Sequence, residues 1–168
     1  NLQNRFFLLG ADQCRDVGDV EKAIREVIGK SHSLGLVGID YIQQMMPDLV
    51  PHAMADWEKV GLAAEELHGL AIRYSFPILI ASQVTRTFAT KEQAGGEQAS
   101  RSDIIAQTTD VGWRVQKTGE NELSVWVWKA REHRSQFGFK LLVDFPKMII
   151  RSSDESITQP ISATNGDW

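Results

Sequence analysis

Short apolar runs alternate with segments of helical periodicity in the first half of the chain. The run Leu34–Gln43 is apolar up to Asp40, and a short continuous run of this kind predicts a strand buried on both faces, as in parallel sheets covered by helices. A second run, Ile78–Gln83, follows the helix breaker Pro77 and predicts another such strand. The remaining predicted elements are a strand at 5–9, a helix that starts at 20 behind an Asp19 N-cap and ends near 29, and a helix at 56–74. Two successive helix-to-strand units predict βαβ crossovers, and hence an α/β fold with a mostly parallel sheet.

The second half of the chain has a different pattern. A short helical turn at 104–109 is followed by segments in which apolar and polar residues alternate, and these predict strands joined as antiparallel hairpins, at 110–115, 122–129, 137–145 and 147–151. Three tryptophans in this region, Trp113, Trp126 and Trp128, either pack against a face of the sheet or form a platform on which bases stack. We expect one domain over 1–151 and, because its composition is polar, a flexible tail over 152–168.

Polar side chains stand where the two apolar strands end. Because the carboxyl ends of parallel strands meet at one edge of a sheet, Asp40 and Gln83 are expected to lie together there, where α/β proteins bind ligands. An unpaired buried carboxylate is costly, so Asp40 needs a partner. A Mg²⁺ ion or its bound water is one such partner, as in the Walker B strand of a P-loop NTPase. The alternative is an aspartate that caps a neighbouring helix or turn.

Composition limits the function classes. The chain has 168 residues, of which 42% are hydrophobic and 24% charged, as in an ordinary globular domain. Its net charge of −4 argues against nucleic-acid binding through overall charge but leaves room for a local basic groove. One cysteine, Cys14, excludes an internal disulfide framework and is typical of a packed, inert thiol. No apolar run approaches the roughly 20 residues of a membrane span.

The segment 84–103 is long and polar, which is unusual for a loop inside a compact domain. Its cations Arg86, Lys91 and Arg101 are candidates for contacts to a phosphate backbone. Two glutamates offset these charges, so a solvated loop of mixed charge is an equal alternative.

Four motifs occur in an order that matches a known family. Gly35–Gln43 is similar to a Walker B segment, Phe76–Arg86 to the next core strand with its Ser-Gln…Arg ending, and Lys129-Ala130-Arg131 to a K-x-R motif. Ser102-Asp103-Ile104 with Thr109–Gly112 is similar to the segment that leads into the next strand. Over residues 5–150 the chain resembles the DnaB-like replicative helicases, a branch of the RecA-like ATPases. The resemblance implies a RecA-like P-loop NTPase core with a mostly parallel sheet and a C-terminal antiparallel hairpin region.

The resemblance also implies a role for each matching residue. Asp40 would hold the Mg²⁺ of bound ATP through water, and Gln83 would sense the γ-phosphate and relay its loss to the loop that follows. Lys129 and Arg131 would act in trans on the phosphates of the neighbouring subunit. The alternative for Arg131 is a surface ion pair with Glu132 or another acid.

The whole protein implied by this resemblance is an ATP-dependent, hexameric DNA helicase that translocates on single-stranded DNA in replication. Expected partners are single-stranded DNA, further copies in a ring, and a primase or helicase loader, in the cytoplasm of a bacterial or phage-infected cell. Two alternatives are another RecA-like ATPase, of the recombinase or circadian-clock type, and a non-hydrolysing RecA-like binding or assembly module.

The sequence departs from the family in two places. The phosphate-binding motif G-x-x-x-x-G-K-[ST] does not occur in these 168 residues, and the segment before Asp110 lacks the arginine of the family's Asp-Leu-Arg stretch. Because the chain begins with Asn1 and the family's P-loop precedes its first strand, we expect it to be the later part of a longer polypeptide or a processed product. We expect this piece alone to bind ATP poorly.

Overall fold

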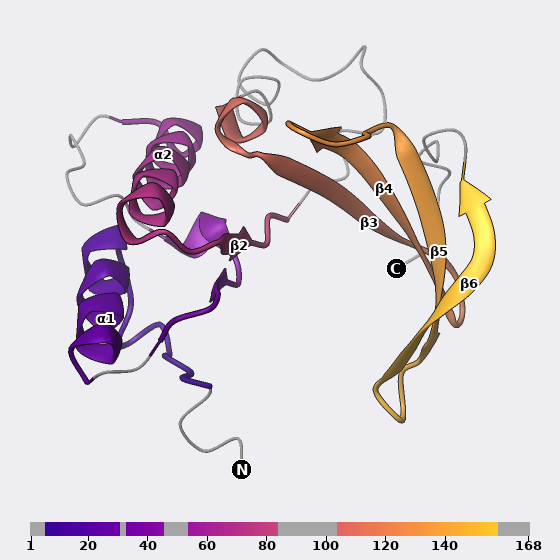
Figure 1. The fold of residues 1–168 in the computed structure, drawn as a ribbon, viewed down its shortest axis with the longest axis horizontal. Coiled ribbons are helices and arrows are strands. Elements are labelled where there is room, and N and C mark those ends of the chain that lie inside the picture. The colour runs from indigo at the N-terminus through magenta and orange to yellow at the C-terminus, as the bar shows by residue number, and fades with distance from the viewer. Residues whose placement is uncertain (1–5, 31–32, 46–53, 84–103, 158–168) are drawn as a thin grey trace. The chain divides into compact units, whose positions relative to one another are not determined.

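The computed structural model describes residues 6–30, 33–45, 54–83 and 104–157 (Figure 1). The chain divides into two compact units, Asn1–Thr85 with Ala94–Thr108, and Arg86–Gln93 with Thr109–Trp168. The expectation of one domain over 1–151 is therefore replaced by two units. In the part of the chain described, none of the helices combines the length and apolar character that a membrane crossing needs.

Helix α1 spans Val17–Gly29 in the first unit, three residues longer at its start than the sequence predicts. Its N-cap is Asp16, not Asp19. The Asp16 backbone is extended and its Oδ1 accepts a hydrogen bond from the Asp19 N–H at 2.7 Å, while Asp19 Oδ2 accepts one from the Arg15 N–H at 2.9 Å. Two carboxylates thus satisfy amides at the start of the helix, and the upstream one decides where it begins.

Helix α2 spans Asp56–Tyr74, as predicted. The Glu58 carboxylate accepts a hydrogen bond from the Ala55 N–H at 2.9 Å and so satisfies an amide ahead of the helix. Ser75 then adopts a left-handed backbone with φ of 56°, which ends the helix. Phe76 is buried beyond this turn, and the chain enters the next strand at Ile78.

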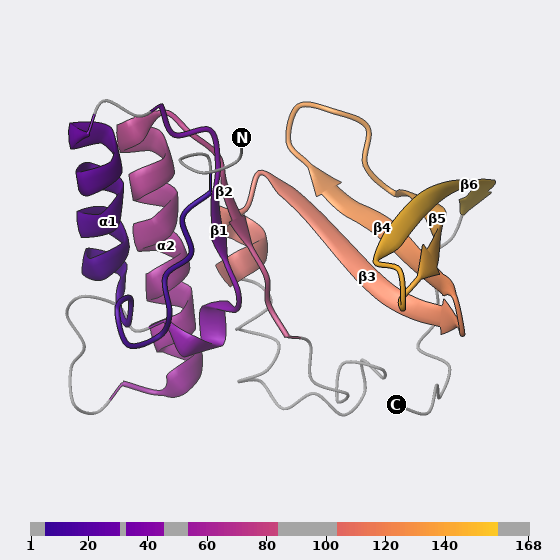
Figure 2. The same ribbon diagram turned by 90° about the horizontal axis from the view of Figure 1, so that it is seen from below.

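Strands β1 (Val37–Ile39) and β2 (Ile78–Ile80) pair in parallel, with Val37 opposite Ile78 and Ile39 opposite Ile80. Figure 2 shows α1 and α2 side by side on one face of this sheet. The core forms there, because the four strand residues just named pack against buried side chains of both helices, among them Ile24, Ala63 and Leu67. The predicted parallel α/β arrangement is confirmed in this unit.

Two expectations for these strands were wrong. The run Leu34–Gln43 is not buried on both faces: Leu36 is 53% exposed and Leu79 50% exposed, since both described helices lie on the opposite face. Residues 6–9 do not form a strand. Their apolar side chains are exposed, and no described strand pairs with them. An apolar run becomes a strand only where a neighbouring strand receives its backbone hydrogen bonds.

Cys14 packs at the edge of the same core. Burial raises the pKa of its thiol above the ordinary value of 9.0, and the nearby Asp19 and Asp16 carboxylates raise it further. The thiol is therefore protonated at neutral pH, in keeping with a packed and inert cysteine.

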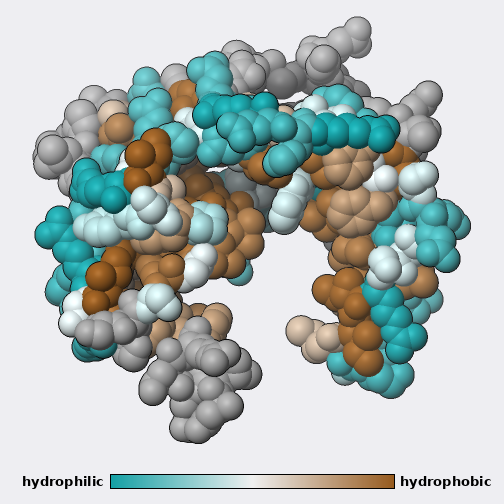
Figure 3. Space-filling model, viewed as in Figure 1, coloured by the Kyte–Doolittle hydropathy of each residue, from teal (hydrophilic) through white to brown (hydrophobic). Residues whose placement is uncertain are grey.

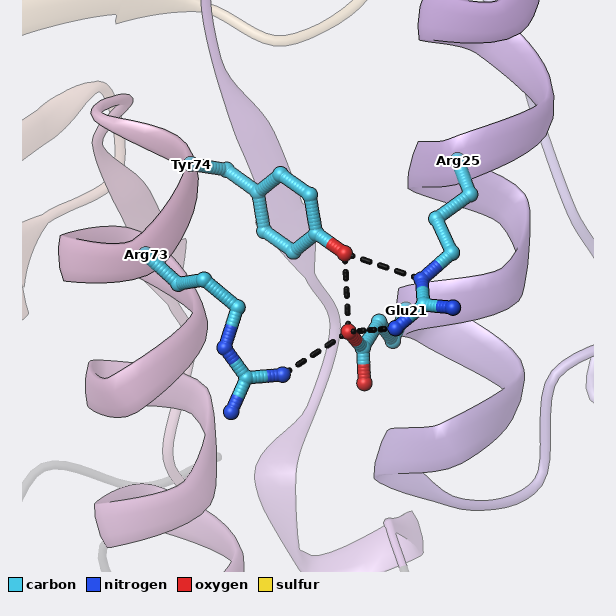
Figure 4. A network of polar contacts seen from close by, with 4 residues as sticks. All are labelled: Glu21, Arg25, Arg73 and Tyr74. Atoms are coloured by element: carbon cyan, nitrogen blue, oxygen red, sulfur yellow. Dashed lines mark hydrogen bonds and ion pairs between the residues drawn. The ribbon is translucent and has the colours of Figure 1, made fainter.

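A polar cluster joins the two helices at their exposed side (Figure 4). Glu21 Oε1 accepts a hydrogen bond from the Tyr74 hydroxyl at 2.8 Å and pairs with Arg25 at 2.7 Å and Arg73 at 2.8 Å. Arg25 Nε also donates to the Tyr74 hydroxyl at 2.9 Å. The hydrogen bond from Tyr74, followed by that from Arg25, lowers the pKa of Glu21 to about 2, from 4.5.

We predict that Glu21→Gln destabilises the chain by about 1–2 kcal/mol at pH 7, because one carboxylate holds donors from both helices. A carboxyl group whose pKa is lowered by folding stabilises the folded state above its unfolded value and loses that effect as it is protonated. The difference between wild type and variant should therefore be full above pH 4.5 and shrink as the pH falls toward 2. Urea unfolding at several pH values measures it. The control is Asp56→Asn, whose side chain is 84% exposed in its pair with Lys59. A pH-independent difference would contradict the prediction.

The second unit is a four-stranded antiparallel sheet in the order β3-β4-β5-β6 (Figure 1). Its strands are β3 (Val111–Gly119), β4 (Glu122–Ala130), β5 (Phe137–Asp144) and β6 (Ile149–Ile157). The predicted hairpin region is confirmed, but the boundary of the tail was wrong: 152–157 continue β6 because they pair with β5, and 158–168 lie outside the described residues.

Apolar side chains dominate one face of this sheet. Opposite residues of antiparallel strands share a face, and Val115, Val125 and Phe139 lie opposite one another in turn. Val125 is buried, whereas several large side chains on β3 are exposed, namely Val111, Trp113 and Val115. Figure 3 shows apolar surface along one side of the sheet and hydrophilic surface along the other.

Candidate functional site

The sheet of the first unit brings Asp40 and Gln83 to one edge, as predicted. Ile39 and Ile80 are opposite residues of two parallel strands, so the residues after them leave the sheet on the same side. The Ala81 N–H donates to the Ile39 carbonyl at 2.9 Å and the Ile42 N–H donates to the Ala81 carbonyl at 2.9 Å. These hydrogen bonds keep the two chain segments together beyond the last strand pair.

An open depression of about 470 Å³ lies between the two strand ends. Five residues line it: Asp40, Tyr41, Ala81, Ser82 and Gln83. Asp40 is exposed, and no hydrogen bond or ion pair joins its carboxylate to another residue of the described ranges. The alternative in which Asp40 caps a described helix or turn is therefore not what this structure shows.

The donor set at this edge suits a hard cation. A carboxylate, a hydroxyl and a side-chain amide supply oxygen ligands, which Mg²⁺ prefers. The described residues contain no group of three or more His, Cys, Asp or Glu side chains that could hold a metal ion by themselves. A single carboxylate fits an ion that takes most of its ligands from water and phosphate oxygens.

Gln43 connects the two strand ends, and the sequence pattern does not single it out. Its Nε2 donates to the Ser82 hydroxyl at 2.9 Å and to the Gln83 carbonyl at 3.0 Å, and its Oε1 accepts from the Gln83 N–H at 3.3 Å. The short 3₁₀ helix η1 (Ile42–Gln44) presents it, anchored by the fully buried Ile42. The available signal was an amide three residues after Asp40. Gln43 fixes the backbone that carries Gln83 to the segment that carries Asp40.

Lys129 and Arg131 lie in the second unit, at the end of β4. Lys129 is half-buried opposite Gly112, and Arg131 is the first residue after the strand. Arg131 Nη1 pairs with Asp110 Oδ1 at 2.8 Å, with the two side chains 54% and 57% exposed. The acid that pairs with Arg131 is thus Asp110 and not Glu132. Because both groups remain open to water, this pair leaves the guanidinium accessible to another anion.

Three predicted DNA contacts, Arg86, Lys91 and Arg101, lie outside the described residues. Of the tryptophans, Trp126 is buried, Trp128 is half-buried and Trp113 is 58% exposed. Trp126 and Trp128 fit the packing interpretation. The ring of Trp128 fills the space beside Gly112, where an added Cβ would overlap it.

No protein-family model matches this sequence, and neither does any curated protein. Solved structures do match. The ATPase domain of a helicase superposes with a TM-score of 0.69 and 14% identity, over 83% of this chain and 52% of that chain. "The Structure Of A DnaB-Like Replicative Helicase And Its Interactions With Primase" superposes with a TM-score of 0.63 and 16% identity, over 78% of this chain and 34% of that chain.

These matches confirm the predicted resemblance and the fold class at the level of the fold. The chain has the fold of the RecA-like ATPase domains of DnaB-like helicases. It spans about half the length of the first structure and about a third of the second.

Proposed function

We propose that this chain is the part of a RecA-like helicase ATPase domain that follows the P-loop, and that the complete protein is an ATP-dependent, hexameric DNA helicase acting in replication. The observation that carries the proposal is the shared edge of β1 and β2, where Asp40 and Gln83 line one depression within a fold common to helicase ATPase domains. Ligands of open α/β sheets bind at the carboxyl ends of the strands.

Asp40 is the residue proposed to bind the metal. When bound, Mg²⁺ and ATP supply the phosphoryl group and the charge that neutralises it. The Asp40 carboxylate would accept hydrogen bonds from water on the metal, which its exposed and unshared position allows. The anion also places a fixed negative charge where a cation is needed.

Gln83 is proposed to contact the γ-phosphate. Its backbone is held by Gln43 through hydrogen bonds at 3.0 and 3.3 Å, so a displacement of Gln83 is resisted by the segment that follows Asp40. Loss of the phosphate would then reach the segment 84–103, which begins directly after Gln83. This arrangement links the state of the nucleotide to the segment that contains the proposed DNA contacts Arg86, Lys91 and Arg101.

Lys129 and Arg131 are proposed to act in trans on the triphosphate of a neighbouring copy. Phosphoryl transfer needs positive charge at the transferred group, and a guanidinium fork matches phosphate oxygens better than an ammonium does. This role requires a ring, for which we propose a hexamer. Further proposed partners are single-stranded DNA and a primase or helicase loader, and the proposed location is the cytoplasm of a bacterial or phage-infected cell.

The test is ATP-dependent unwinding of a forked DNA duplex by the complete protein, together with ATP hydrolysis in the presence and absence of single-stranded DNA. We expect Mg²⁺-dependent hydrolysis, stimulated by DNA, and displacement of one strand. Hydrolysis with strand exchange but no unwinding would favour a recombinase. A complete protein that neither binds nor hydrolyses ATP would favour the non-hydrolysing module, which the absence of G-x-x-x-x-G-K-[ST] from these 168 residues keeps as the second candidate.

A further inference from the structure

Arg131 is held at the end of β4 by its neighbour across the sheet. The last pair of the β3–β4 ladder is Val111 opposite Ala130. One residue further on, the Arg131 N–H donates to the Asp110 carbonyl at 2.9 Å. The backbone positions of Asp110 and Arg131 are therefore fixed relative to each other by the sheet.

The side chains repeat this connection. Arg131 Nη1 lies 2.8 Å from Asp110 Oδ1, so the same two residues are joined through both backbone and side chain. A long, exposed arginine side chain otherwise samples many rotamers, and restricting it costs entropy when it binds. An ion pair between exposed groups is weak, so it can orient the guanidinium and still yield to a triphosphate, which offers more charge and two acceptor oxygens.

A β-bulge next to this pair sets the direction of the strand end. Gly112 pairs with Lys129 but Trp113 pairs with Val127, so Trp128 is the extra residue of β4. A bulge shifts the alternation of side chains and re-aims those that follow. Gly112 permits the bulge, because a Cβ there would overlap the Trp128 ring.

The connection after Arg131 is also fastened to β4. The Gln136 N–H donates to the Val127 carbonyl at 2.8 Å, and its Nε2 donates to the Trp128 carbonyl at 2.8 Å. Gln136 has a left-handed backbone with φ of 62°, which turns the chain into β5. Arg131 thus leaves a strand end that is fastened on both sides.

We propose that Asp110 is a positioning residue for Arg131: it holds the guanidinium in the orientation from which it reaches the neighbouring subunit's triphosphate. This inference rests on the proposed function, since it needs Arg131 to act in trans. Asp110 does not itself contact the nucleotide. It acts only through Arg131, and that dependence can be tested.

The experiment is a double-mutant cycle in the complete ATPase, with wild type, Asp110→Asn, Arg131→Ala and the double variant. We expect Asp110→Asn to lower kcat about 5–10-fold, with the KM for ATP changed less than about twofold, because orientation and not ground-state binding is lost. Asp110→Glu, which keeps the charge, should restore part of the rate. In the Arg131→Ala background, adding the Asp110→Asn substitution should change the single-turnover rate by less than about twofold.

The matched control is Asp144→Asn. Asp144 pairs with Lys147 at 2.7 Å in the same sheet and its side chain is 39% exposed, but it has no contact with Arg131 in the described structure. We expect this variant to keep the wild-type kcat, and both Asn variants to melt within about 2 °C of wild type.

The outcomes separate the two levels of the argument. If Arg131→Ala is strongly impaired but Asp110→Asn lowers the rate equally with and without Arg131, only the positioning role is overturned. An Asp110→Asn variant as active as Asp144→Asn overturns it as well. If Arg131→Ala retains the full rate, the role of Arg131 in the proposed function fails, and the inference fails with it.

Discussion

Arg131→Ala should lower the kcat for ATP hydrolysis by the complete protein about 10³–10⁵-fold, the range measured for arginines that reach a triphosphate from a neighbouring subunit or partner. The KM for ATP should change little, because the guanidinium acts mainly on charge that develops in the transition state. Arg131→Lys keeps the charge but loses the planar fork of donors, so we expect an intermediate rate.

Steady-state hydrolysis with saturating single-stranded DNA measures this effect. The control is Arg134→Ala, which removes a cation from the same connection between β4 and β5. Arg134 lies over the Phe137 ring, 5.9 Å from its centroid, and is not part of the K-x-R motif. We expect it to change kcat less than about threefold. A fall of similar size in both variants would mean that the connection as a whole, and not Arg131, is required.

Asp40→Asn should lower the kcat about 10–100-fold, and it should raise the Mg²⁺ concentration needed for half-maximal hydrolysis about tenfold. Asparagine keeps the shape of the side chain but removes the charge, and groups that orient a metal through its bound water typically contribute effects of this size. The measurement is a Mg²⁺ titration at fixed ATP. Glu65→Gln, which removes an exposed carboxylate from α2 in the same unit, is the control and should leave the Mg²⁺ dependence unchanged. An Asp40→Asn curve identical to wild type would refute the metal role.

These two variants together test the action in trans. A ring of Arg131→Ala subunits and a ring of Asp40→Asn subunits should both be impaired. When the subunits are mixed in equal amounts, about a quarter of the interfaces combine an intact Asp40 from one subunit with an intact Arg131 from the next. Hydrolysis should therefore rise above either parent. If Arg131 acted within its own subunit, mixing would restore nothing.

The strand-end site was largely predictable from the order of residues. Polar residues after two apolar runs, separated by one helix, place Asp40 and Gln83 at one edge because the crossover makes the strands parallel. The connection through Gln43 could not be found this way. It depends on how the chain turns after Asp40, where the buried Ile42 and its hydrogen bond to Ala81 direct the neighbouring amide toward β2.

Errors in the predicted elements have the same origin. Residues 6–9 and 152–157 were assigned by composition, as strand and tail, yet the first is not paired with a described strand and the second pairs with β5. Strand formation depends on a partner for backbone hydrogen bonds, and a polar sequence at an edge position can still supply them. Likewise, the partner of Arg131 is not its sequence neighbour Glu132 but Asp110, brought opposite by the antiparallel ladder.

The sequence by itself determined the local features: the two helices, the parallel and antiparallel strand patterns, the polar strand ends and the K-x-R motif. Periodicity and the strand-terminating residues are local, so the order of residues is sufficient for them. Only the tertiary structure decided which side chains meet, including Gln43 with Gln83, Asp110 with Arg131, and Glu21 with Tyr74. Such contacts depend on register, bulges and the crossing of elements far apart in the chain, which local sequence patterns do not specify.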